Sequence, residues 1–332
     1  MPLHLYFGPQ DLLRCRFAVS PLGQTHEAVR VLRRPWRHGY HLPWLRRIRG
    51  ALAGLDLTEL WALMPAPGYT PDFLGPPPAA PCPSFEEELA RLRATDPAAA
   101  RGELARSLAT APDSPDAPVV RRLLADPARA VRRLADLTER AWEALVAPDW
   151  PRLRALLEAD IAFRSRRLAD GGLERLFADL RPAVSWAPGR LTVHTTGSVP
   201  PSQTLDGRGL LLMPSVFVWP EVVSGFAPPW QPTVIYPARG VGGLWQEPGP
   251  GAAEALVRLL GPNRAAILGR LTEPASTSAL ALRHRLAPSS VSAHLAVLRG
   301  AGLLTSRRQG REVLYERTPL GIALAAGEPP PA

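Results

Sequence analysis

The chain has 332 residues, of which 46% are hydrophobic and 21% charged, and its formal net charge is +9. This length allows about two domains at roughly 150 residues each, and the composition excludes a wholly disordered chain and a disulfide-rich scaffold, since only two cysteines occur. No apolar run reaches the roughly 18 residues of a membrane-spanning helix, so we expect no membrane partner. The two cysteines and an N-terminus without the pattern of a secretory signal favour a cytoplasmic protein.

The positive charge lies at the two ends of the sequence. All 39 basic side chains are arginine, which first indicates a GC-rich coding genome. Residues 1–50 hold nine arginines and two acidic residues, residues 251–332 hold ten and five, and the stretch between them has a net charge of −3. Such basic ends are typical of proteins that bind nucleic acid.

The first 181 residues carry helical patterns interrupted by proline-rich breaks. Phe85–Arg93 follows Ser84, a residue suited to cap a helix, and residues 128–146 place apolar side chains at 3-and-4 spacing. Helices are also expected over 153–168 and 173–180. Residues 65–83 contain eight prolines and predict an extended loop.

Short β-branched or apolar segments, separated by glycine and proline turns, follow from residue 182. The expected strands are Val184–Trp186, Leu191–Thr195, Gly209–Met213, Val216–Trp219 and Thr233–Tyr236. The predicted fold is therefore α+β. A mostly helical N-terminal domain with a small β-sheet spans 1–247 (helical over 1–181, sheet over 182–247), and a second domain spans 248–332.

The last eighty residues predict a winged helix-turn-helix. Helices are expected over 253–260, 263–271, 277–285 and 289–301, and strands over 303–308 and 311–317. In the fourth helix Val291, Leu295 and Leu298 recur at i, i+4 and i+7, so they should face the core, and Gly302 suits its C-terminal cap. A helix-turn-helix followed by an arginine-tipped hairpin is the arrangement in which the second helix enters the DNA major groove.

This region resembles the ArsR-type winged-helix regulators of bacteria. The likeness rests on "LGPNRAAILGRL" (residues 260–271) and "APSSVSAHLAVLRGAGLLTSRRQGREVLYERTPLG" (residues 287–321). The opening "FGPQDLLRCRFAVSPLGQTHEAV", with "HLPWLRR" after it, is similar to an uncharacterised N-terminal domain often joined to such regulators in actinobacteria. The resemblance implies a DNA-binding transcriptional regulator, a repressor that acts as a homodimer on a two-fold operator.

The sequence also departs from that family. Arg285 stands at a turn position often held by glycine, Ala287 replaces a frequent serine cap, and Ala293 replaces a polar side chain of the recognition helix. The positions used by metal-sensing members hold Ala279–Leu282 and Gly321–Ala326, which are apolar or glycine. We therefore expect no metal site and no cofactor.

The candidate DNA-binding residues lie on the fourth helix and the wing, and double-stranded DNA is the expected partner. They are Ser289, Ser290, Ser292, Ala293, His294, Arg299, Arg307, Arg308 and Arg311. Hydroxyl, imidazole and guanidinium groups can donate hydrogen bonds to phosphates or base edges. The competing interpretation is that His294 and the three wing arginines are ordinary solvated side chains.

The N-terminal region is expected to hold any sensor. All nine tryptophans precede residue 246, and although most should belong to the core, together they favour a cavity for a small organic effector. The usual motifs of hydrolases, metalloproteases and nucleotide-binding enzymes do not occur, so we expect no enzyme. The alternative is an enzyme or a ligand-binding domain of other function fused to a DNA-binding module.

Overall fold

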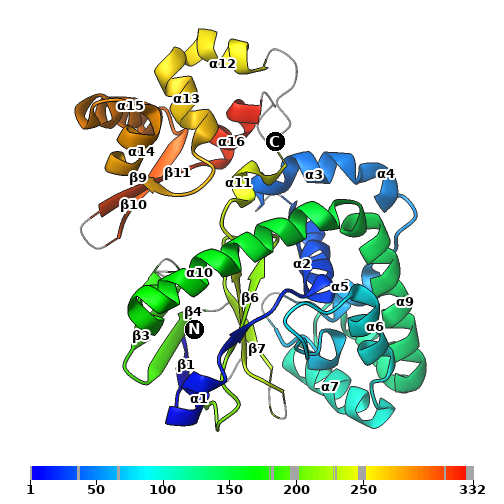
Figure 1. The fold of residues 1–332 in the computed structure, drawn as a ribbon. Helices are drawn as coiled ribbons and strands as arrows, with labels where there is room; N and C mark the ends of the chain where they lie inside the picture. The colour runs from blue at the N-terminus through cyan, green and yellow to red at the C-terminus, as the bar shows by residue number, and fades with distance from the viewer. Residues whose placement is uncertain are drawn as a thin grey trace. The chain divides into compact units, whose positions relative to one another are not determined.

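The computed structural model describes residues 2–35, 38–65, 68–178, 180, 183–194, 202–226, 228, 230–245, 252–309 and 312–326. The chain forms two compact units, whose elements are labelled in Figure 1. Unit 1 comprises residues 1–33 and 48–238, and unit 2 comprises residues 34–47 and 239–332. This division differs from a single boundary at 247–248, because residues 34–47 and 239–245 pack with the C-terminal segment.

One half of unit 1 is a group of helices that pack around α2 and α9. Its elements are α2 (Pro21–Arg33), α4 (Arg49–Leu52), α5 (Thr58–Ala62), η3 (Asp72–Leu74), α6 (Phe85–Arg93), α7 (Pro97–Thr110), α8 (Ala117–Ala125), α9 (Pro127–Leu145) and η4 (Ala147–Asp149). The predicted cap of α6 is confirmed, since Ser84 and Glu87 form a capping box. On α9, Val131, Leu134 and Leu137 face the interior as predicted.

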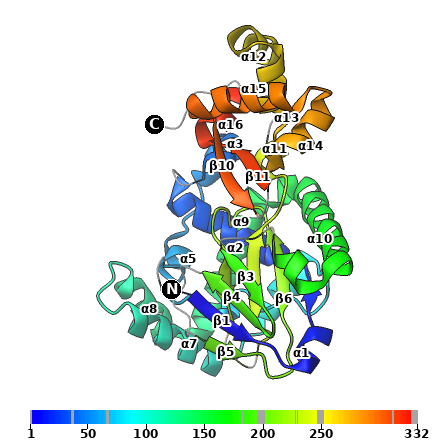
Figure 2. The same cartoon turned by 90° about the vertical axis from the view of Figure 1, so that its left-hand side faces the viewer.

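The other half of unit 1 contains two four-stranded sheets (Figure 2). The first has the order β3 (Val184–Ala187), β4 (Arg190–His194), β1 (Pro2–Tyr6) and β5 (Ser202–Thr204). The second has the order β2 (Arg16–Phe17), β6 (Leu211–Ser215), β8 (Thr233–Pro237) and β7 (Val223–Gly225). The short helix α1 (Pro9–Leu13) joins β1 to β2.

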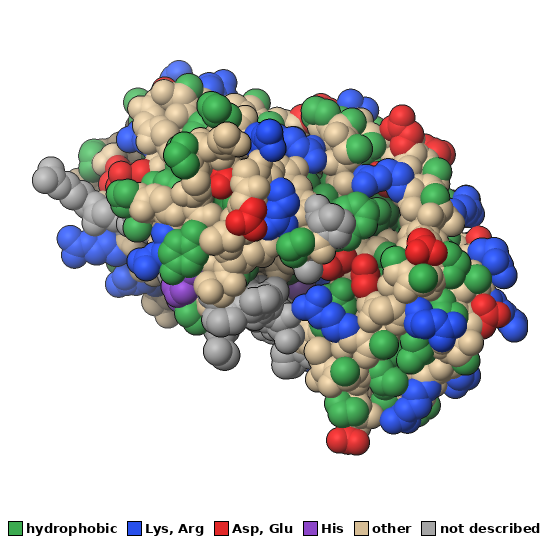
Figure 3. Space-filling model, turned by 90° about the horizontal axis from the view of Figure 1, so that it is seen from below, with side chains coloured by type: hydrophobic (Ala, Val, Ile, Leu, Met, Phe, Trp, Pro, Cys, Tyr) green, Lys and Arg blue, Asp and Glu red, His purple; other side chains and the backbone are tan. Residues whose placement is uncertain are grey.

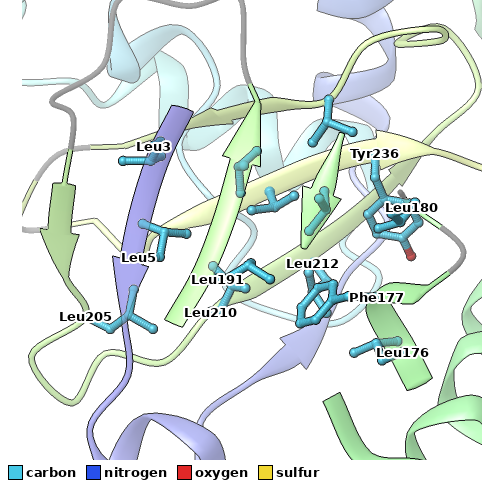
Figure 4. Close-up of a cluster of buried hydrophobic side chains, with 14 residues drawn as sticks. Leu3, Leu5, Leu176, Phe177, Leu180, Leu191, Leu205, Leu210, Leu212 and Tyr236 are labelled. Atoms are coloured by element: carbon cyan, nitrogen blue, oxygen red, sulfur yellow. The ribbon is translucent and has the colours of Figure 1, made fainter. Parts of the chain in front are cut away.

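A single apolar core joins the two sheets (Figure 4). Leu3 and Leu5 of β1 and Leu191 of β4 meet Leu212 and Tyr236 of the second sheet, and the C-terminal part of α10 (Trp150–Ala178) adds Leu176 and Phe177. Gly171 and Gly172 have non-helical backbone angles and kink α10 between the two helices expected there. Among the described residues, no helix is both long and apolar enough to cross a membrane.

The α+β class is confirmed, but the sheets are not confined to the later residues. The N-terminal strand β1 pairs with β4, with Pro2 opposite His194, so the first residues of the chain complete a sheet. The strand expected at Val216–Trp219 is wrong. The Val216 N–H donates to Gln24 Oε1 at 3.0 Å and the Phe217 N–H to Ser215 Oγ at 3.2 Å, so side chains satisfy this buried apolar run instead of a neighbouring strand.

A buried carboxyl holds the start of α2. Glu88 of α6 accepts hydrogen bonds from the Ser20 hydroxyl (2.8 Å) and the Leu22 N–H (2.9 Å), and Ser20 Oγ accepts one from the Gly23 N–H (2.8 Å). Burial raises the pKa of Glu88 to about 7, against its ordinary 4.5, and the two donors only partly oppose this. The folded state therefore binds this proton more tightly than the unfolded chain.

Replacing Glu88 by glutamine should remove a pH dependence of stability. Because the folded pKa is the higher one, the stabilisation from the protonated carboxyl is complete below about pH 4.5 and is lost as the pH rises to about 7. Between pH 4.5 and 8 the native protein should lose on the order of 3 kcal/mol that the Glu88→Gln variant does not lose. Thermal unfolding measured across this range tests the difference. Glu86→Gln, an exposed position of the same helix, is the control, and parallel profiles for all three proteins would contradict the assignment.

Candidate nucleic-acid interface

Unit 2 is built around a helix-turn-helix and a three-stranded sheet. Its C-terminal elements are α12 (Ala252–Leu260), α13 (Pro262–Arg270), β9 (Ala275–Ser276), α14 (Thr277–His284), α15 (Pro288–Gly300), β10 (Leu304–Gln309), β11 (Glu312–Arg317) and α16 (Pro319–Ala326). The four predicted helices and the predicted hairpin are all present, each within one or two residues of the expected bounds. The sequence did not indicate β9, which pairs with β11 through two residues only.

Three apolar side chains fix the orientation of α15. Val291, Leu295 and Leu298 are at most 1% exposed and pack in the core of unit 2 with residues of α13 and α14 such as Ile267 and Leu280. Because these three side chains share one face of the helix, the opposite face is left to solvent. Ser289, Ser290, Ser292 and Ala293 are exposed, as is Arg299, whereas His294 is half-buried.

The C-terminal end of α15 determines where the wing begins. Gly302 has φ 71°, its N–H donates to Arg299 O at 2.9 Å, and the Leu303 N–H donates to Leu298 O at 2.9 Å. This is a Schellman motif, in which glycine takes the left-handed position without steric cost. Leu303 is buried in the same core, so the chain turns directly from α15 into β10.

The turn before α15 leaves its first amides without a side-chain cap. Ser276 caps α14 through its hydroxyl, as predicted, and Arg285 closes that helix in the left-handed conformation with φ 53°. Ala287 occupies the N-cap of α15 and has no side-chain acceptor, while Pro288 begins the helix. The positive end of the α15 dipole and the exposed serines therefore lie together, an arrangement that favours an anion such as a phosphate.

The wing is a regular antiparallel hairpin that follows α15. Leu304 pairs with Arg317 and Gln309 with Glu312. Arg299 of α15 donates to Ser306 Oγ of β10 at 3.4 Å, which links the helix to the wing. Arg308 is exposed and Arg307 half-buried, while Arg311 lies outside the described residues.

The net charge of the protein is concentrated in unit 2. This unit holds 15 arginines and six acidic residues, a formal net charge of +9, whereas unit 1 holds 24 of each and is neutral. In unit 1 the charges are paired across helices, for example Arg93 with Glu139 (2.7 Å) and Arg133 with Glu59 (2.9 Å). Arginine and acidic side chains are interspersed over the helices at the right of Figure 3.

The remaining histidine of the helix-turn-helix is a partly buried side chain of α14. His284 is half-buried, and burial together with Arg270 and Arg283 lowers its pKa, so it stays neutral. Within the described ranges, no group of three or more His, Cys, Asp or Glu side chains is placed to hold a metal ion.

Arg317, which the sequence analysis identified only as the end of a strand, is 3% exposed, and its guanidinium donates a hydrogen bond to Gly242 O.

Comparison with known protein families gives two matches. Residues 259–307 match a family described as a helix-turn-helix domain, and residues 84–242 match a family of unknown function, DUF5937. Neither a curated protein nor a solved structure matches the chain. The chain thus joins a helix-turn-helix domain to a domain of uncharacterised function, which confirms the combination expected from the two resemblances.

Gly321 should not tolerate alanine, because α16 approaches the main chain of Leu303, between α15 and β10, very closely. A Cβ at Gly321 would lie 2.1 Å from the carbonyl oxygen of Leu303, which is main chain and cannot move freely. We expect Gly321→Ala to lower the free energy of unfolding of unit 2 by about 1–3 kcal/mol. Gly300→Ala, where nothing lies within 4 Å, is the matched control and should be neutral or slightly stabilising. Equal melting temperatures for both variants would refute this close packing.

Proposed function

We propose that this protein is a bacterial transcriptional regulator of the ArsR type, which binds double-stranded DNA through α15 and the wing and acts as a cytoplasmic repressor. The observation that carries the proposal is the exposed, small and polar N-terminal half of α15. Its opposite face is anchored by Val291, Leu295 and Leu298, and it lies in a unit with a net charge of +9.

The dimensions and chemistry of this face suit the major groove. A helix of about 10–12 Å diameter fits a groove about 12 Å wide, and short side chains let its backbone approach the bases. Ser290, Ser292 and His294 supply groups for base edges, while the arginines supply charge for phosphates. Ser289 and the uncapped amides of the first turn fit a phosphate at the helix N-terminus.

We further propose a symmetric homodimer on a two-fold operator, because a single winged helix covers only a short half-site. Val257 and Leu259 of α12 are exposed, at 41% and 66%, so this helix presents apolar side chains to solvent on two of its sides. The last helix, α16, is packed against η2 (Gly39–His41) of the same chain, so α12 is the better placed of the two for a second copy. Sedimentation of a monomer at micromolar concentration, with one protein bound per operator, would oppose this proposal.

We also propose that unit 1 binds a small organic effector. A hollow of about 640 Å³ lies beside α1 and β5, lined by side chains that include Phe7, Gln10 and Asp206. Most tryptophans of unit 1 pack against neighbours, as Trp142 does on Phe85 and Trp186 on Phe7, so this hollow takes the place of the tryptophan-lined cavity expected from the sequence. Native mass spectrometry of the purified protein tests for a bound molecule, and an operator affinity that no such molecule changes would exclude sensing.

The arginines of the wing should contribute to DNA affinity only through contacts with phosphates. Replacing Arg307 and Arg308 by alanine should weaken binding to every DNA sequence and flatten the log–log salt dependence by about 1–2 units, near 0.9 for each phosphate that the wing no longer neutralises. Changes at Ser290, Ser292 or His294 should instead alter sequence preference, by about 1–3 kcal/mol for each base contact. Fluorescence anisotropy at four or more salt concentrations measures both effects.

Arg101→Ala is the matched control, since Arg101 is an exposed arginine of α7 in the neutral unit 1. It should leave affinity and slope unchanged. If the two wing replacements leave the slope as steep as in the native protein, the wing does not touch the DNA backbone. If the substitutions in α15 weaken binding to all DNA sequences equally, the side chains of this helix do not contact the bases.

A further inference from the structure

The DNA-binding unit contains a segment from far upstream in the sequence. Residues 34–47, here called the strap, contribute η2 and α3 (Leu42–Arg47) to unit 2, and η2 packs on α16. The strap carries four arginines and no acidic residue. The helix-turn-helix family match begins at residue 259, so the strap lies outside the part of the unit that the match recognises.

Aromatic side chains hold the strap to the segment that precedes α12. Trp44 is fully buried and stacks on Trp245, with ring centroids 6.1 Å apart and planes 27° from parallel. The Trp245 Nε1–H donates to His41 Nδ1 at 2.9 Å, and the guanidinium of Arg47 lies 5.2 Å from the Trp245 ring centroid. Stacking and cation–π contacts of this kind add to apolar burial, so the strap is a fixed part of unit 2.

Residues 239–245, on which the strap packs, also contact the helix-turn-helix. Arg239 pairs with Glu273, in the turn between α13 and β9. In α11 (Val241–Leu244), a Cβ at Gly243 would lie 2.7 Å from the Thr272 side chain, which shows how closely α11 approaches the same turn. The strap, α11 and the 271–273 turn therefore form one packed layer.

This layer ends on the last residue of the wing. The Tyr40 hydroxyl donates to the main-chain oxygen of Arg317 at 3.1 Å, and Arg317 Nη2 donates to Gly242 O at 2.8 Å. Burial raises the pKa of Tyr40 to about 12, so its hydroxyl remains a donor at neutral pH. The strap and α11 thus hold both the backbone and the side chain of Arg317.

The burial of Arg317 removes its charged guanidinium from water, which costs solvation free energy. It is 3% exposed, and within the described residues its Nε and Nη1 have no hydrogen-bond partner and its guanidinium has no carboxylate partner. Burial lowers its pKa to about 10. By contrast, buried Arg164 of unit 1 is paired with Asp160 at 2.9 Å. Burying a guanidinium with a single hydrogen-bond acceptor is destabilising. We therefore infer that Arg317 serves to hold the end of β11 in place and does not add to the stability of unit 2.

We propose that the strap is the positioning element of the wing: Tyr40, acting with Gly242 on Arg317, sets the direction in which β10 and β11 leave the body of unit 2. The effect of this positioning on DNA affinity rests on the proposed function, whereas the positioning itself does not. In sequence, the strap follows α2 and precedes α4, both of which belong to unit 1. The minimal DNA-binding module is then the strap together with residues 239–332, and not residues 248–332 alone.

Two variants disturb this contact without altering the wing itself. Tyr40→Phe removes the hydroxyl and keeps the ring. Gly242→Ala inserts a Cβ 2.9 Å from the Tyr40 ring and 3.2 Å from Arg317 Nη2. The controls are Tyr315→Phe, a tyrosine of β11 whose hydroxyl makes no hydrogen bond within the described residues, and Gly269→Ala, where nothing lies within 4 Å.

Hydrogen exchange of the full-length protein without DNA gives the first readout. Amides of residues 303–317 should exchange faster in Tyr40→Phe and Gly242→Ala and as in the native protein in both controls, while α13 to α15 stay protected. Unchanged exchange of the hairpin in both variants overturns the proposal, whatever the protein does with DNA.

A double-mutant cycle on DNA affinity gives the second readout, in the native full-length background. If Tyr40 positions the wing, the loss caused by Arg308→Ala should shrink by about threefold or more when Tyr40 is already phenylalanine. Fully additive losses contradict the positioning role. A native protein that binds no DNA would refute the proposed function and leave the exchange result to decide this one.

Discussion

The burial of Val291, Leu295 and Leu298 is the constraint on which the rest of unit 2 depends. These three side chains set the rotation of α15 about its own axis, which leaves Ser290 and Ser292 exposed and His294 half-buried. The Schellman motif at Gly302 then carries the chain from that fixed helix into β10, and Gly321 allows α16 to close over the junction. The exposed face of α15, which we propose contacts DNA, is therefore a consequence of core packing.

Charge and connectivity divide the protein along the same line. The helices and sheets of unit 1 balance their charges internally, while unit 2 keeps a surplus of nine positive charges. Four of the arginines in unit 2 belong to the strap, which enters from unit 1 at residue 34 and returns to it at residue 47. The proposed sensor in unit 1 and the proposed DNA-binding surface in unit 2 are thus connected by the chain at more than one point. Coupling between two sites requires a physical element that both can bias.

Local signals predicted the helix-turn-helix and the wing well, whereas long-range pairing limited the prediction of unit 1 and of the strap. The caps at Ser84, Ser276 and Gly302 act within a few residues, so α6, α14 and α15 could be located from sequence. The pairing of Pro2 with His194 and the contact of Tyr40 with Arg317 join residues about 190 and 280 positions apart, which no local pattern specifies. Residues 216–219 show the opposite error: a buried apolar run predicts a strand, yet Gln24 and Ser215 satisfy its backbone.

The most direct test of this account is a footprint of DNA on the protein. Hydrogen exchange of the full-length chain, measured with and without a duplex selected from a random pool, shows which amides the DNA protects. The account predicts protection confined to unit 2, strongest at residues 288–300 and 304–317, with unit 1 unchanged. Protection that falls on unit 1, or that leaves α15 and the wing exchanging as in the free protein, would contradict it.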